Sequence, residues 1–407
     1  MTPSTPSLSG VYSSTPDPEN PHSEDSLQAS PVHAALEASA RIRTLCPPNP
    51  AVGCTLITSS GHRVTGSTQA VGGPHAEIMA LRAAAEQGLS VRGATAYVTL
   101  EPCSHHGRTP PCCDALIAAG VGKVVVATLD PNPLVAGRGV QRLQAAGIEV
   151  DVLPTDHAVA RAVRELNIGF FSRMIRQTPW VRMKMAASLD GTTALDNGTS
   201  QWITGEAARA DGHAWRARAC AVLTGIGTVL EDDPMLDARL VDTPRQPHLV
   251  VVDSRLETPL DARLFQAPAH GLTRRIFIYC AVADGQRQAA LEALGATVIP
   301  LPGQSPGTEG KVDLAAMLRD LARREVNELH VEAGHKLNGS LIREGLADEF
   351  LLYLAPKLLG SGRGLASFGP LEKLEDGVEL GFQSVDRMGD DLRILARVVG
   401  RDDFLTA

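Results

Sequence analysis

Long apolar runs are missing from this sequence of 407 residues: no stretch of 18 or more apolar residues occurs, and the N-terminus has no basic stretch followed by an apolar one. We therefore expect neither a membrane span nor a secretory signal. An excess of positive charge is missing too, because 38 Lys and Arg face 46 Asp and Glu, for a formal net charge of −8. Nucleic acids and membrane surfaces attract proteins rich in Lys and Arg, so we expect broad binding to neither.

Aromatic residues are scarce as well, at 4% of the chain, and no basic stretch is interleaved with aromatics as in proteins that bind single-stranded nucleic acid. A small phosphorylated substrate remains compatible with the acidic balance, because one phosphate needs only a few local donors. Cysteine occurs seven times, an odd number that does not suit a disulfide framework. Together with the missing signal, this usage predicts a reducing, cytoplasmic location.

The length predicts two domains, because one hydrophobic core rarely extends over 407 residues. Residues 1–25 are rich in Ser, Thr and Pro and nearly devoid of large apolar side chains, which predicts a disordered tail. We predict a first domain over residues 26–155, a connector helix over 156–178 that ends at Thr178-Pro179, and a second domain over 179–407.

Local patterns predict the elements of each domain. A helix is expected from Pro31 up to Cys46-Pro47-Pro48, where proline forbids its continuation. Strands then alternate with helices and include the apolar strand KVVVATLD at 123–130, which predicts a three-layer α/β domain. In the second domain, apolar residues alternate with Arg182 and Lys184, which predicts a strand with Lys184 fixed on one face. The last strands, in 349–360 and 390–400, are expected to be antiparallel edges of a mixed sheet.

A pattern of metal ligands lies in PHAE at 74–77 and TLEPCSHHGRTPPCC at 99–113. His75, Cys103 and Cys112 supply one imidazole and two thiolates, which suit tetrahedral zinc and leave a fourth position for water. Zinc lowers the pKa of such a water towards neutrality, and Glu77 can move protons without being a ligand. His75 and Cys112 each begin a predicted helix, where the partial positive charge favours a thiolate. The pattern predicts hydrolytic chemistry.

The same residues form a more specific signature. His-x-Glu, followed by Pro-Cys and a second Cys, is typical of zinc-dependent nucleobase deaminases. Here the cysteines are nine residues apart, with SHHGRTPP between them, where other deaminases have two residues.

This insertion and several further motifs resemble the bifunctional riboflavin-biosynthesis proteins, in which a pyrimidine deaminase is fused to a reductase. The resemblance covers nearly everything from about residue 30 onward. The motifs that carry it are PCSHHGRTPPC, PNPAVG at 48–53, DPNPLVAGRG at 130–139, KMAASLDG at 184–191, SQWIT at 200–204, TVLEDDPML at 228–236, VEAG at 331–334 and APKLLG at 355–360.

The resemblance implies a fold and an activity for each half. The N-terminal half would be a cytidine-deaminase-like three-layer α/β/α domain that uses one Zn²⁺ per chain to deaminate 2,5-diamino-6-ribosylamino-4(3H)-pyrimidinone 5′-phosphate hydrolytically. The C-terminal half would be a dihydrofolate-reductase-like α/β domain that uses NADPH to reduce the ribosyl to the ribityl side chain. The spacing G-x-G-x-x-G of a Rossmann fold is absent from it. A small phosphorylated pyrimidine is thus the expected partner, and we expect a homo-oligomer.

Matching positions imply the site residues. Glu77 would be the catalytic residue of the deaminase and Lys184 that of the reductase. The deaminase substrate would contact Asn49, His105 and Arg108. The reductase substrate would contact Ser200, Arg216, Leu236, Arg239 and Glu332. NADPH would contact Ala186, Trp202, Thr228, Asp232, Ser254 and Gly334.

Other interpretations remain open from the sequence. The chain could be another zinc nucleobase or nucleoside deaminase, such as a cytidine or tRNA adenosine deaminase, fused to an inactive or unrelated domain. The long insertion between the cysteines and the acidic balance argue against it. A non-enzymatic fold stabilised by zinc would instead close the metal site with a fourth protein ligand. Finally, one half alone could be active.

Overall fold

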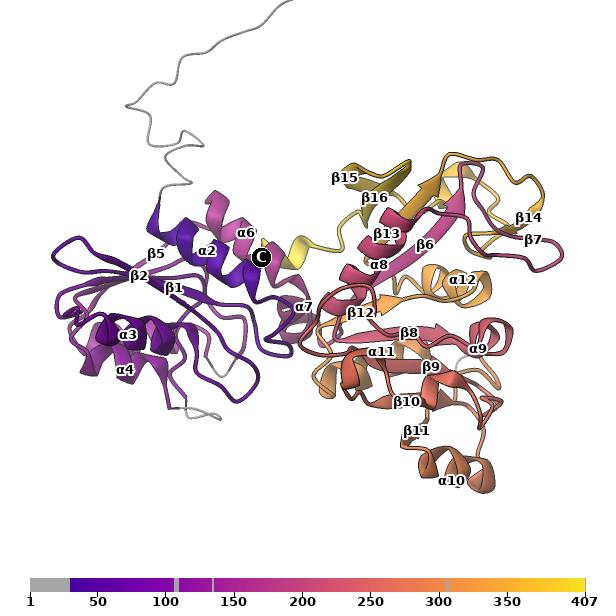
Figure 1. Cartoon of the computed structure of the whole chain (residues 1–407), viewed down its shortest axis with the longest axis horizontal. Helices are drawn as coiled ribbons and strands as arrows, with labels where there is room; N and C mark the ends of the chain where they lie inside the picture. Colours follow the sequence, from indigo (N-terminus) through magenta and orange to yellow (C-terminus); the bar gives the residue numbers. More distant parts are fainter. Residues whose placement is uncertain (1–29, 106–109, 134, 305–306, 407) are drawn as a thin grey trace, which may run out of the picture.

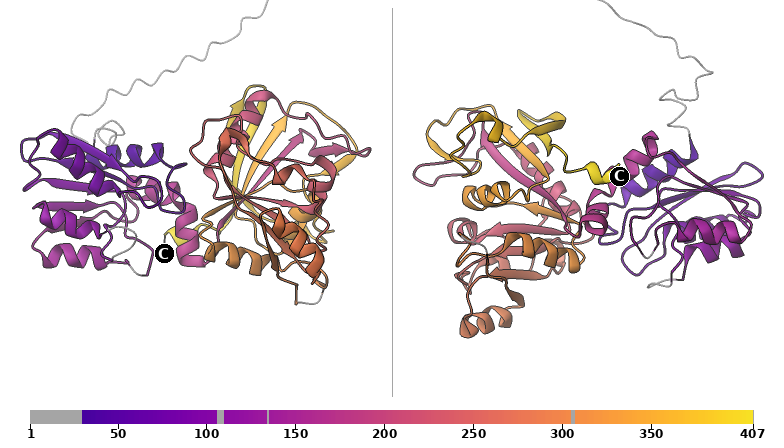
Figure 2. Two further views of the ribbon diagram at one scale, coloured as in Figure 1. Left: turned by 60° about the horizontal axis from the view of Figure 1, so that its bottom comes forward. Right: turned by 180° about the vertical axis from the view of Figure 1, so that it is seen from behind.

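A computed structural model describes residues 30–105, 110–133, 135–304 and 307–406. It shows a first α/β domain and a second α/β domain, joined by the helices α6 (Ala158–Leu166) and α7 (Ile168–Arg176) (Figure 1). Two further views show that the C-terminal end of the chain returns to this junction (Figure 2). The tail predicted for residues 1–25 lies outside the described residues.

The first sheet has the strand order β2-β1-β3-β4-β5, in which β1 is antiparallel to both neighbours and β3, β4 and β5 are parallel. Helices α2 and α6 lie on one face, and α3, α4 and α5 lie on the other (Figure 1). The predicted three-layer arrangement is therefore confirmed. The bounds are β1 (Gly53–Ile57), β2 (Arg63–Ser67), β3 (Thr95–Val98), β4 (Lys123–Val126), β5 (Glu149–Val152), α2 (Pro31–Arg41), α3 (Ala76–Glu86), α4 (Cys112–Ala118) and α5 (Arg138–Ala145).

Helix α2 ends earlier than the sequence predicts. It stops at Arg41 rather than at Cys46, and turns follow. Pro47 and Pro48 have no amide hydrogen, so the carbonyls four residues before them would lose their helical partners. The carbonyl of Thr44 instead accepts a hydrogen bond of 2.9 Å from Arg245 Nε in the second domain.

The connector was predicted as one helix, and the structure corrects this. The helix is interrupted at Asn167, whose φ of −108° is not helical. The Asn167 side chain accepts from the backbone N–H of Ala51 at 2.7 Å and donates to the carbonyls of Ala51 and Val163 at 3.1 Å. Such side-chain bonds to the backbone compete with helix formation. They also attach the connector to the loop that precedes β1.

Helix α7 approaches the second domain so closely that a side chain would not fit at Gly169. A Cβ atom there would lie 2.7 Å from the carbonyl oxygen of Asn327 and 2.5 Å from Glu328 Cγ. Glycine is therefore required for backbone-to-backbone packing at this point.

The second sheet has the strand order β11-β10-β9-β8-β12-β6-β13-β16-β15. The strands from β11 to β13 are parallel, and β16 and β15 are antiparallel additions. The bounds are β6 (Trp180–Ser188), β8 (Ala221–Gly225), β9 (His248–Val252), β10 (Ile276–Cys280), β11 (Ala296–Pro300), β12 (Glu328–Val331), β13 (Glu349–Ala355), β15 (Leu380–Met388) and β16 (Asp391–Val398). A separate pair is formed by β7 (Thr192–Leu195) and β14 (Gly362–Gly364).

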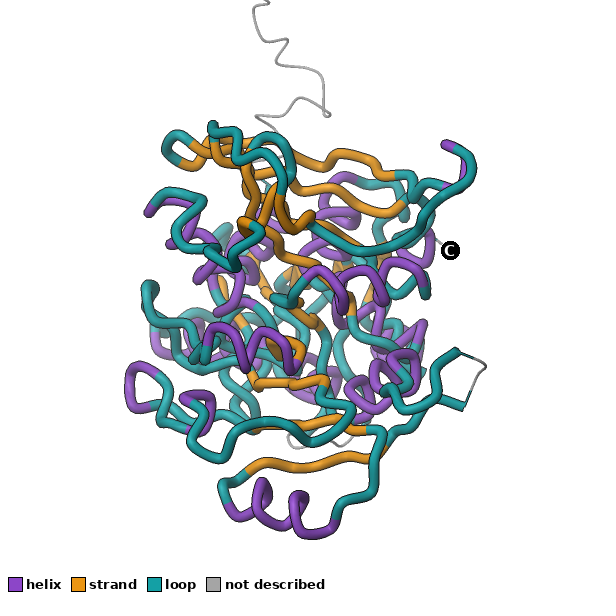
Figure 3. Tube along the Cα trace, turned by 90° about the vertical axis from the view of Figure 1, so that its right-hand side faces the viewer, coloured by secondary structure: helices purple, strands orange, loops and turns teal. Residues whose placement is uncertain are grey.

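Helices cover both faces of the second sheet (Figure 3). Apolar side chains of α11 and α12 pack on one face, while those of α8, α9 and α10 pack on the other. The bounds are α8 (Glu206–Arg218), α9 (Ile226–Asp232), α10 (Gly285–Ala293), α11 (Leu314–Arg323) and α12 (His335–Arg343), with short 3₁₀ turns at Arg263–Phe265, Ala269–Gly271, Leu374–Asp376 and Asp403–Leu405.

The prediction for the last strands is partly wrong. β13 is not an antiparallel edge but runs parallel to β6 inside the sheet, whereas β16 is antiparallel as expected. The edge itself is β15, which the sequence analysis did not identify because its residues are polar or exposed at most positions.

Arg182 shows why alternation in β6 does not mean exposure to solvent. It is 1% exposed, donates to Glu328 Oε2 at 2.7 Å and to Glu349, and stacks on Trp215 of α8 at 4.5 Å. Because helices cover both faces of the sheet, the polar side of this strand is buried as well. The guanidinium offsets the charge of two buried carboxylates at the centre of the second domain.

The substitution Arg182→Met should lower the free energy of unfolding of the second domain by about 3 kcal/mol, because it leaves buried carboxylates with less compensation. The value falls at the lower end for a broken buried pair, since Arg218 and Arg397 also contact these carboxylates. Calorimetry of the full chain measures the effect. The control Arg323→Met removes an exposed ion pair with Asp320 and should leave the transition nearly unchanged; equal effects of the two changes would contradict the prediction.

Candidate active sites

The predicted metal ligands come together in the first domain, beside the N-terminal ends of helices α3 and α4. His75 is the N-cap of α3 and Cys112 is the first residue of α4, while Cys103 lies in the loop after β3. His75 Nδ1 lies 3.7 Å from Cys103 Sγ and 3.3 Å from Cys112 Sγ, and the ligand atoms all lie within 4.8 Å of one another. The backbone N–H of Cys112 also donates to Cys103 Sγ, at 3.3 Å.

These residues fit a zinc ion. A tetrahedral site places nitrogen and sulfur ligands roughly 3.5–3.8 Å apart, close to the observed separations. Among the described residues no fourth His, Cys, Asp or Glu joins the group. A hydrogen bond from the Cys112 thiol lowers the pKa of Cys103 and raises the pKa of Cys112. The site thus already favours thiolate on Cys103, and a cation between the sulfurs would favour it on both.

Glu77 lies beside this group on the first turn of α3. It is 3% exposed, and burial raises the pKa of its carboxyl to about 7, with a further contribution from the charge on Cys103. A carboxyl with a pKa near neutrality can both accept and release a proton at physiological pH.

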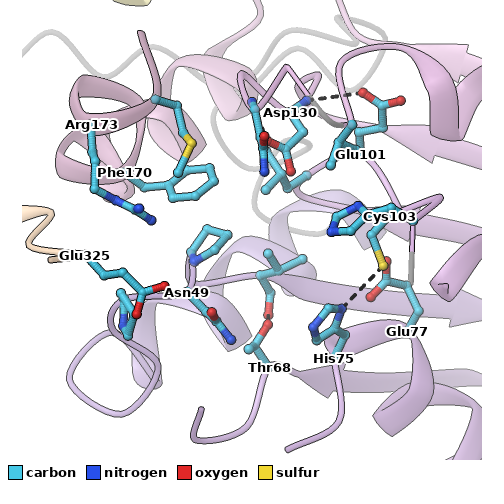
Figure 4. Close-up of a pocket in the computed structure, with 18 of the residues that line it drawn as sticks. Asn49, Thr68, His75, Glu77, Glu101, Cys103, Asp130, Phe170, Arg173 and Glu325 are labelled. Atoms are coloured by element: carbon cyan, nitrogen blue, oxygen red, sulfur yellow. Dashed lines mark hydrogen bonds between the residues drawn. The ribbon is translucent and has the colours of Figure 1, made fainter. Parts of the chain in front are cut away.

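A cavity of about 380 Å³ opens over His75, Glu77 and Cys103 (Figure 4). Asn49 and His105, both predicted substrate contacts, line it. His105 Nδ1 is buried and has no hydrogen-bond partner in the described part of the chain. Arg108, the third predicted contact, lies outside the described residues.

The sequence analysis missed acidic residues of this cavity. Glu101 and Asp130 line it, and the Glu101 carboxylate accepts four backbone N–H bonds of 2.8–3.3 Å, two from the loop before α5 (Asp130 and Gly137) and two from the first turn of α5 (Gly139 and Val140). Burial raises the pKa of Asp130 to about 7. At Gly139 a Cβ would lie 2.1 Å from the carbonyl oxygen of Pro102, so the first turn of α5 can approach Glu101 this closely only with glycine there. The motif DPNPLVAGRG contains Asp130, Gly137 and Gly139, but its sequence does not show that these residues lie against Glu101.

The cavity also has walls from outside the first domain. Phe170 and Arg173 come from α7, and Glu325 comes from the second domain (Figure 4). None of these residues was predicted as a site residue, because contacts between domains leave no local pattern.

A second cavity, of about 250 Å³, lies in the second domain at the carboxyl ends of β6, β8 and β12. This edge of a parallel sheet is the usual place for a ligand site. It brings together a large part of the predicted reductase residues, namely Lys184, Ala186, Ser200, Thr228, Asp232, Glu332 and Gly334.

Charged residues in this second site are paired. Glu332 accepts hydrogen bonds from Arg216, one of them from Nη2 at 2.8 Å, and lies 3.6 Å from Lys184 Nζ. Burial alone would raise the pKa of Glu332, but Arg216 and Lys184 hold it well below its usual range. Arg216, although it does not line the cavity, is therefore joined to it through Glu332.

Other predicted reductase residues do not line the cavity. Leu236 is buried, and the Arg239 guanidinium pairs with Asp237 at 2.9 Å. Trp202 is 65% exposed and stacks on Arg209, and Ser254 lies just beyond the end of β9. The structure leaves these four positions outside the second cavity.

The residues of the second cavity fit an anionic dinucleotide. Gly334 is the N-cap of α12, and no side chain caps this helix, so its first backbone N–H groups are available to an anion.

Comparison with known families gives a match for each domain. The family described as the cytidine and deoxycytidylate deaminase zinc-binding region matches residues 26–128, and the RibD C-terminal domain matches residues 179–394. The riboflavin biosynthesis protein RibD of Escherichia coli K12 is 42% identical over 372 residues, which cover 88% of this chain and 96% of that protein. The Aquifex aeolicus protein of the same name is 38% identical over 88% of this chain and 95% of its own length.

Solved structures agree. RibD of Acinetobacter baumannii matches with a TM-score of 0.78 and 37% identity, over 91% of this chain and 98% of that one. A Thermotoga maritima protein described as a diaminohydroxyphosphoribosylaminopyrimidine deaminase and 5-amino-6-(5-phosphoribosylamino)uracil reductase matches with a TM-score of 0.77 and 29% identity, over 90% and 97% of the two chains.

These matches confirm the resemblance and the fold class predicted for each half. In the described residues, no helix is long and apolar enough to span a membrane. The chain belongs to the RibD family of bifunctional riboflavin-biosynthesis enzymes, in which a zinc-binding deaminase domain is followed by a reductase domain.

Proposed function

We propose that the first domain deaminates 2,5-diamino-6-ribosylamino-4(3H)-pyrimidinone 5′-phosphate and that the second domain then reduces the ribosyl group of the product. The observation that carries the proposal is the buried Glu77 carboxyl beside His75, Cys103 and Cys112 at the floor of a cavity. A structural zinc site would be closed by a fourth protein ligand, and none occurs among the described residues. The Thermotoga maritima relative is described as a deaminase of this pyrimidine class, which supports the same substrate.

In the deaminase, His75, Cys103 and Cys112 would hold the zinc ion. Zinc supplies a Lewis acid that makes a water molecule acidic near neutral pH. Glu77 would take a proton from the attacking water and return protons to the ring nitrogen and to the departing ammonia. Asn49, His105 and Arg108 would hold the substrate, and the buried Nδ1 of His105, which has no hydrogen-bond partner among the described residues, supports its part in this set.

In the reductase, NADPH supplies the hydride. Lys184 would contact the reacting end of the substrate, held near it by the ionised Glu332, which Arg216 fixes on its other side. The remaining proposed substrate contacts are Ser200, Leu236 and Arg239. The proposed NADPH contacts are Ala186, Trp202, Thr228, Asp232, Ser254 and Gly334.

The proposal includes a homo-oligomer that works in the cytoplasm. β15 is one of the two edge strands of the second sheet among the described strands, and its exposed Phe382 and Val385 are apolar. Exposed edges of this kind pair readily with another strand. None of the seven cysteines is in a disulfide bond, which suits a reducing compartment.

One assay tests the order of the two reactions. Zinc-replete full-length protein receives the diamino-pyrimidine ribosyl phosphate, with and without NADPH, while ammonia and the nicotinamide absorbance are followed together. Ammonia should appear without NADPH, and NADPH should be consumed only once deaminated product is present. Absence of ammonia would contradict the proposed substrate, and ammonia without NADPH oxidation would limit the activity to the first domain.

The substitution Glu77→Gln should lower kcat of deamination by about 10²–10⁴-fold, because the amide cannot transfer the protons. Zinc content measured by atomic emission should remain one ion per chain, since Glu77 is not a ligand. Glu86→Gln, an exposed change on the same helix, serves as the control. Normal turnover by Glu77→Gln would exclude the proton-transfer role.

The substitution Lys184→Ala should reduce kcat/KM for NADPH-dependent reduction by about 10–100-fold through the loss of one charged contact, with deamination unchanged. Each activity is measured separately, with deaminated product supplied for the reductase. Lys311→Ala, an exposed change in the same domain, should affect neither reaction. Equal losses in both activities would indicate misfolding rather than a role for Lys184.

The substitution Phe382→Lys should convert the oligomer into a smaller species, because a charge in the centre of a buried apolar edge is costly. Light scattering after gel filtration measures the mass of the particle. Leu294→Lys makes the same change at another exposed apolar residue and should leave the mass unchanged. An unchanged mass for Phe382→Lys would exclude β15 as the interface.

A further inference from the structure

The first cavity combines acidic walls with one permanent cation. Its described lining includes the carboxyl groups of Glu77, Glu101, Asp130 and Glu325, while Arg173 is the one Lys or Arg among the described lining residues. Ionised carboxylates among these groups repel the negative charge of a phosphorylated substrate that enters the cavity. Arg173 is the described residue that attracts it.

Arg173 lies at the other end of the cavity from His75, Cys103 and Glu77 (Figure 4). The reacting ring carbon has to lie near Glu77, so the sugar phosphate of the substrate has to extend away from it. In a cavity with this shape, the direction away from Glu77 leads towards Arg173 and Phe170.

The Arg173 side chain is held in place but keeps donors for a ligand. Its Nε donates to Asn327 Oδ1 at 2.6 Å, and its guanidinium lies 5.9 Å from the centre of the Phe170 ring. In the described part of the chain, neither Nη group donates a hydrogen bond to a protein acceptor. A guanidinium with its inner nitrogen fixed and its outer nitrogens available suits two parallel hydrogen bonds to a phosphate.

Asn327 belongs to the second domain, directly before β12, and connects it to the cavity. Its Nδ2 donates to the carbonyl of Pro48 at 2.8 Å, next to Asn49, while its own carbonyl accepts from Trp180 N at 2.8 Å. One amide side chain therefore fixes both Arg173 and the loop that carries Asn49.

We propose that Arg173 binds the phosphate of the deaminase substrate and that Asn327 positions the Arg173 guanidinium, so that the reductase domain takes part in substrate selection by the deaminase. The proposal rests on the proposed function of the first domain. It assigns Arg173 to substrate binding and Asn327 to positioning.

The test compares the phosphorylated substrate with its dephosphorylated riboside, using the full-length zinc-replete protein. Arg173→Met keeps the packing on Phe170 but removes the charge. KM for the phosphorylated compound should rise by about 10–100-fold, the loss expected for a charged hydrogen-bonded contact, while kcat and the KM for the riboside change by less than about 3-fold. Arg173→Lys, which keeps the charge but not the planar fork, should give an intermediate KM.

A matched control is Arg161→Met, which removes an exposed arginine of α6 that does not line the cavity. It should leave the ratio of kcat/KM for the two compounds unchanged. Asn327→Ala should raise KM for the phosphorylated compound in the same direction as Arg173→Met but by less, since the guanidinium stays charged. Reduction of supplied deaminated product should remain normal in each variant, which reports on folding.

The outcomes separate the two proposals. If the wild type deaminates neither compound, the proposed function fails, and the phosphate role fails with it. If the wild type is active and Arg173→Met raises KM equally for both compounds, or for neither, the proposed function stands and the phosphate role is wrong. Should Arg173→Met lose reductase activity through misfolding, Arg173→Lys decides, because unchanged selectivity between the two compounds in that variant overturns the proposal.

Discussion

The side chain of Asn327 is the contact on which the arrangement of this protein depends. Its amide binds the Pro48 carbonyl of the first domain and the Arg173 guanidinium of the connector, while its carbonyl receives the first amide of β6. Three segments far apart in the sequence therefore meet at one small polar residue. The contact between Gly169 and Asn327 brings α7 close enough for this to happen. Together with the bonds from Asn167 to Ala51, the Asn327 side chain fixes the α7 wall of the first cavity relative to the His75, Cys103 and Cys112 cluster.

The two candidate active sites each contain a buried glutamate, and the pKa values of the two carboxyl groups are shifted in opposite directions. Glu77 has thiolate sulfur near it, and burial raises the pKa of its carboxyl to about 7. Glu332 is buried as well, but Arg216 and Lys184 hold the pKa of its carboxyl well below the usual range. The first environment suits a group that exchanges protons, and the second suits a group that stays charged and orients its neighbours. The difference follows from the surrounding charges rather than from the residue type.

Much of the fold and the chemistry was predictable because it depends on local patterns. His75, Glu77, Cys103 and Cys112 lie at helix starts and a strand end that short stretches of sequence specify. Features decided between distant segments were not predictable. Asn167 interrupts the connector because it binds Ala51, more than a hundred residues away.

The same distinction between local sequence patterns and contacts of distant segments applies to the residues of the sites. Arg182 appears polar and exposed in a period-2 strand, yet helix α8 covers it. The position of Arg173 in the wall of the first cavity depends on the packing of α7 and of the second domain, so no sequence motif predicts it. Motifs identify the candidate residues for the chemistry, and the packing of domains decides which other residues line the cavities.

The second domain begins at Trp180, and its last short turn contains Phe404, whose ring centre lies 6.1 Å from that of Trp180. Both ends of this domain thus lie together against α7, with Arg176 packed on the two rings. A domain whose two ends lie close together can be fused to another domain, or separated from it, without a change in the order of its own strands. The same adjacency makes the second domain a natural subject for circular permutation, with new termini opened at a surface loop and the old ones linked across α7.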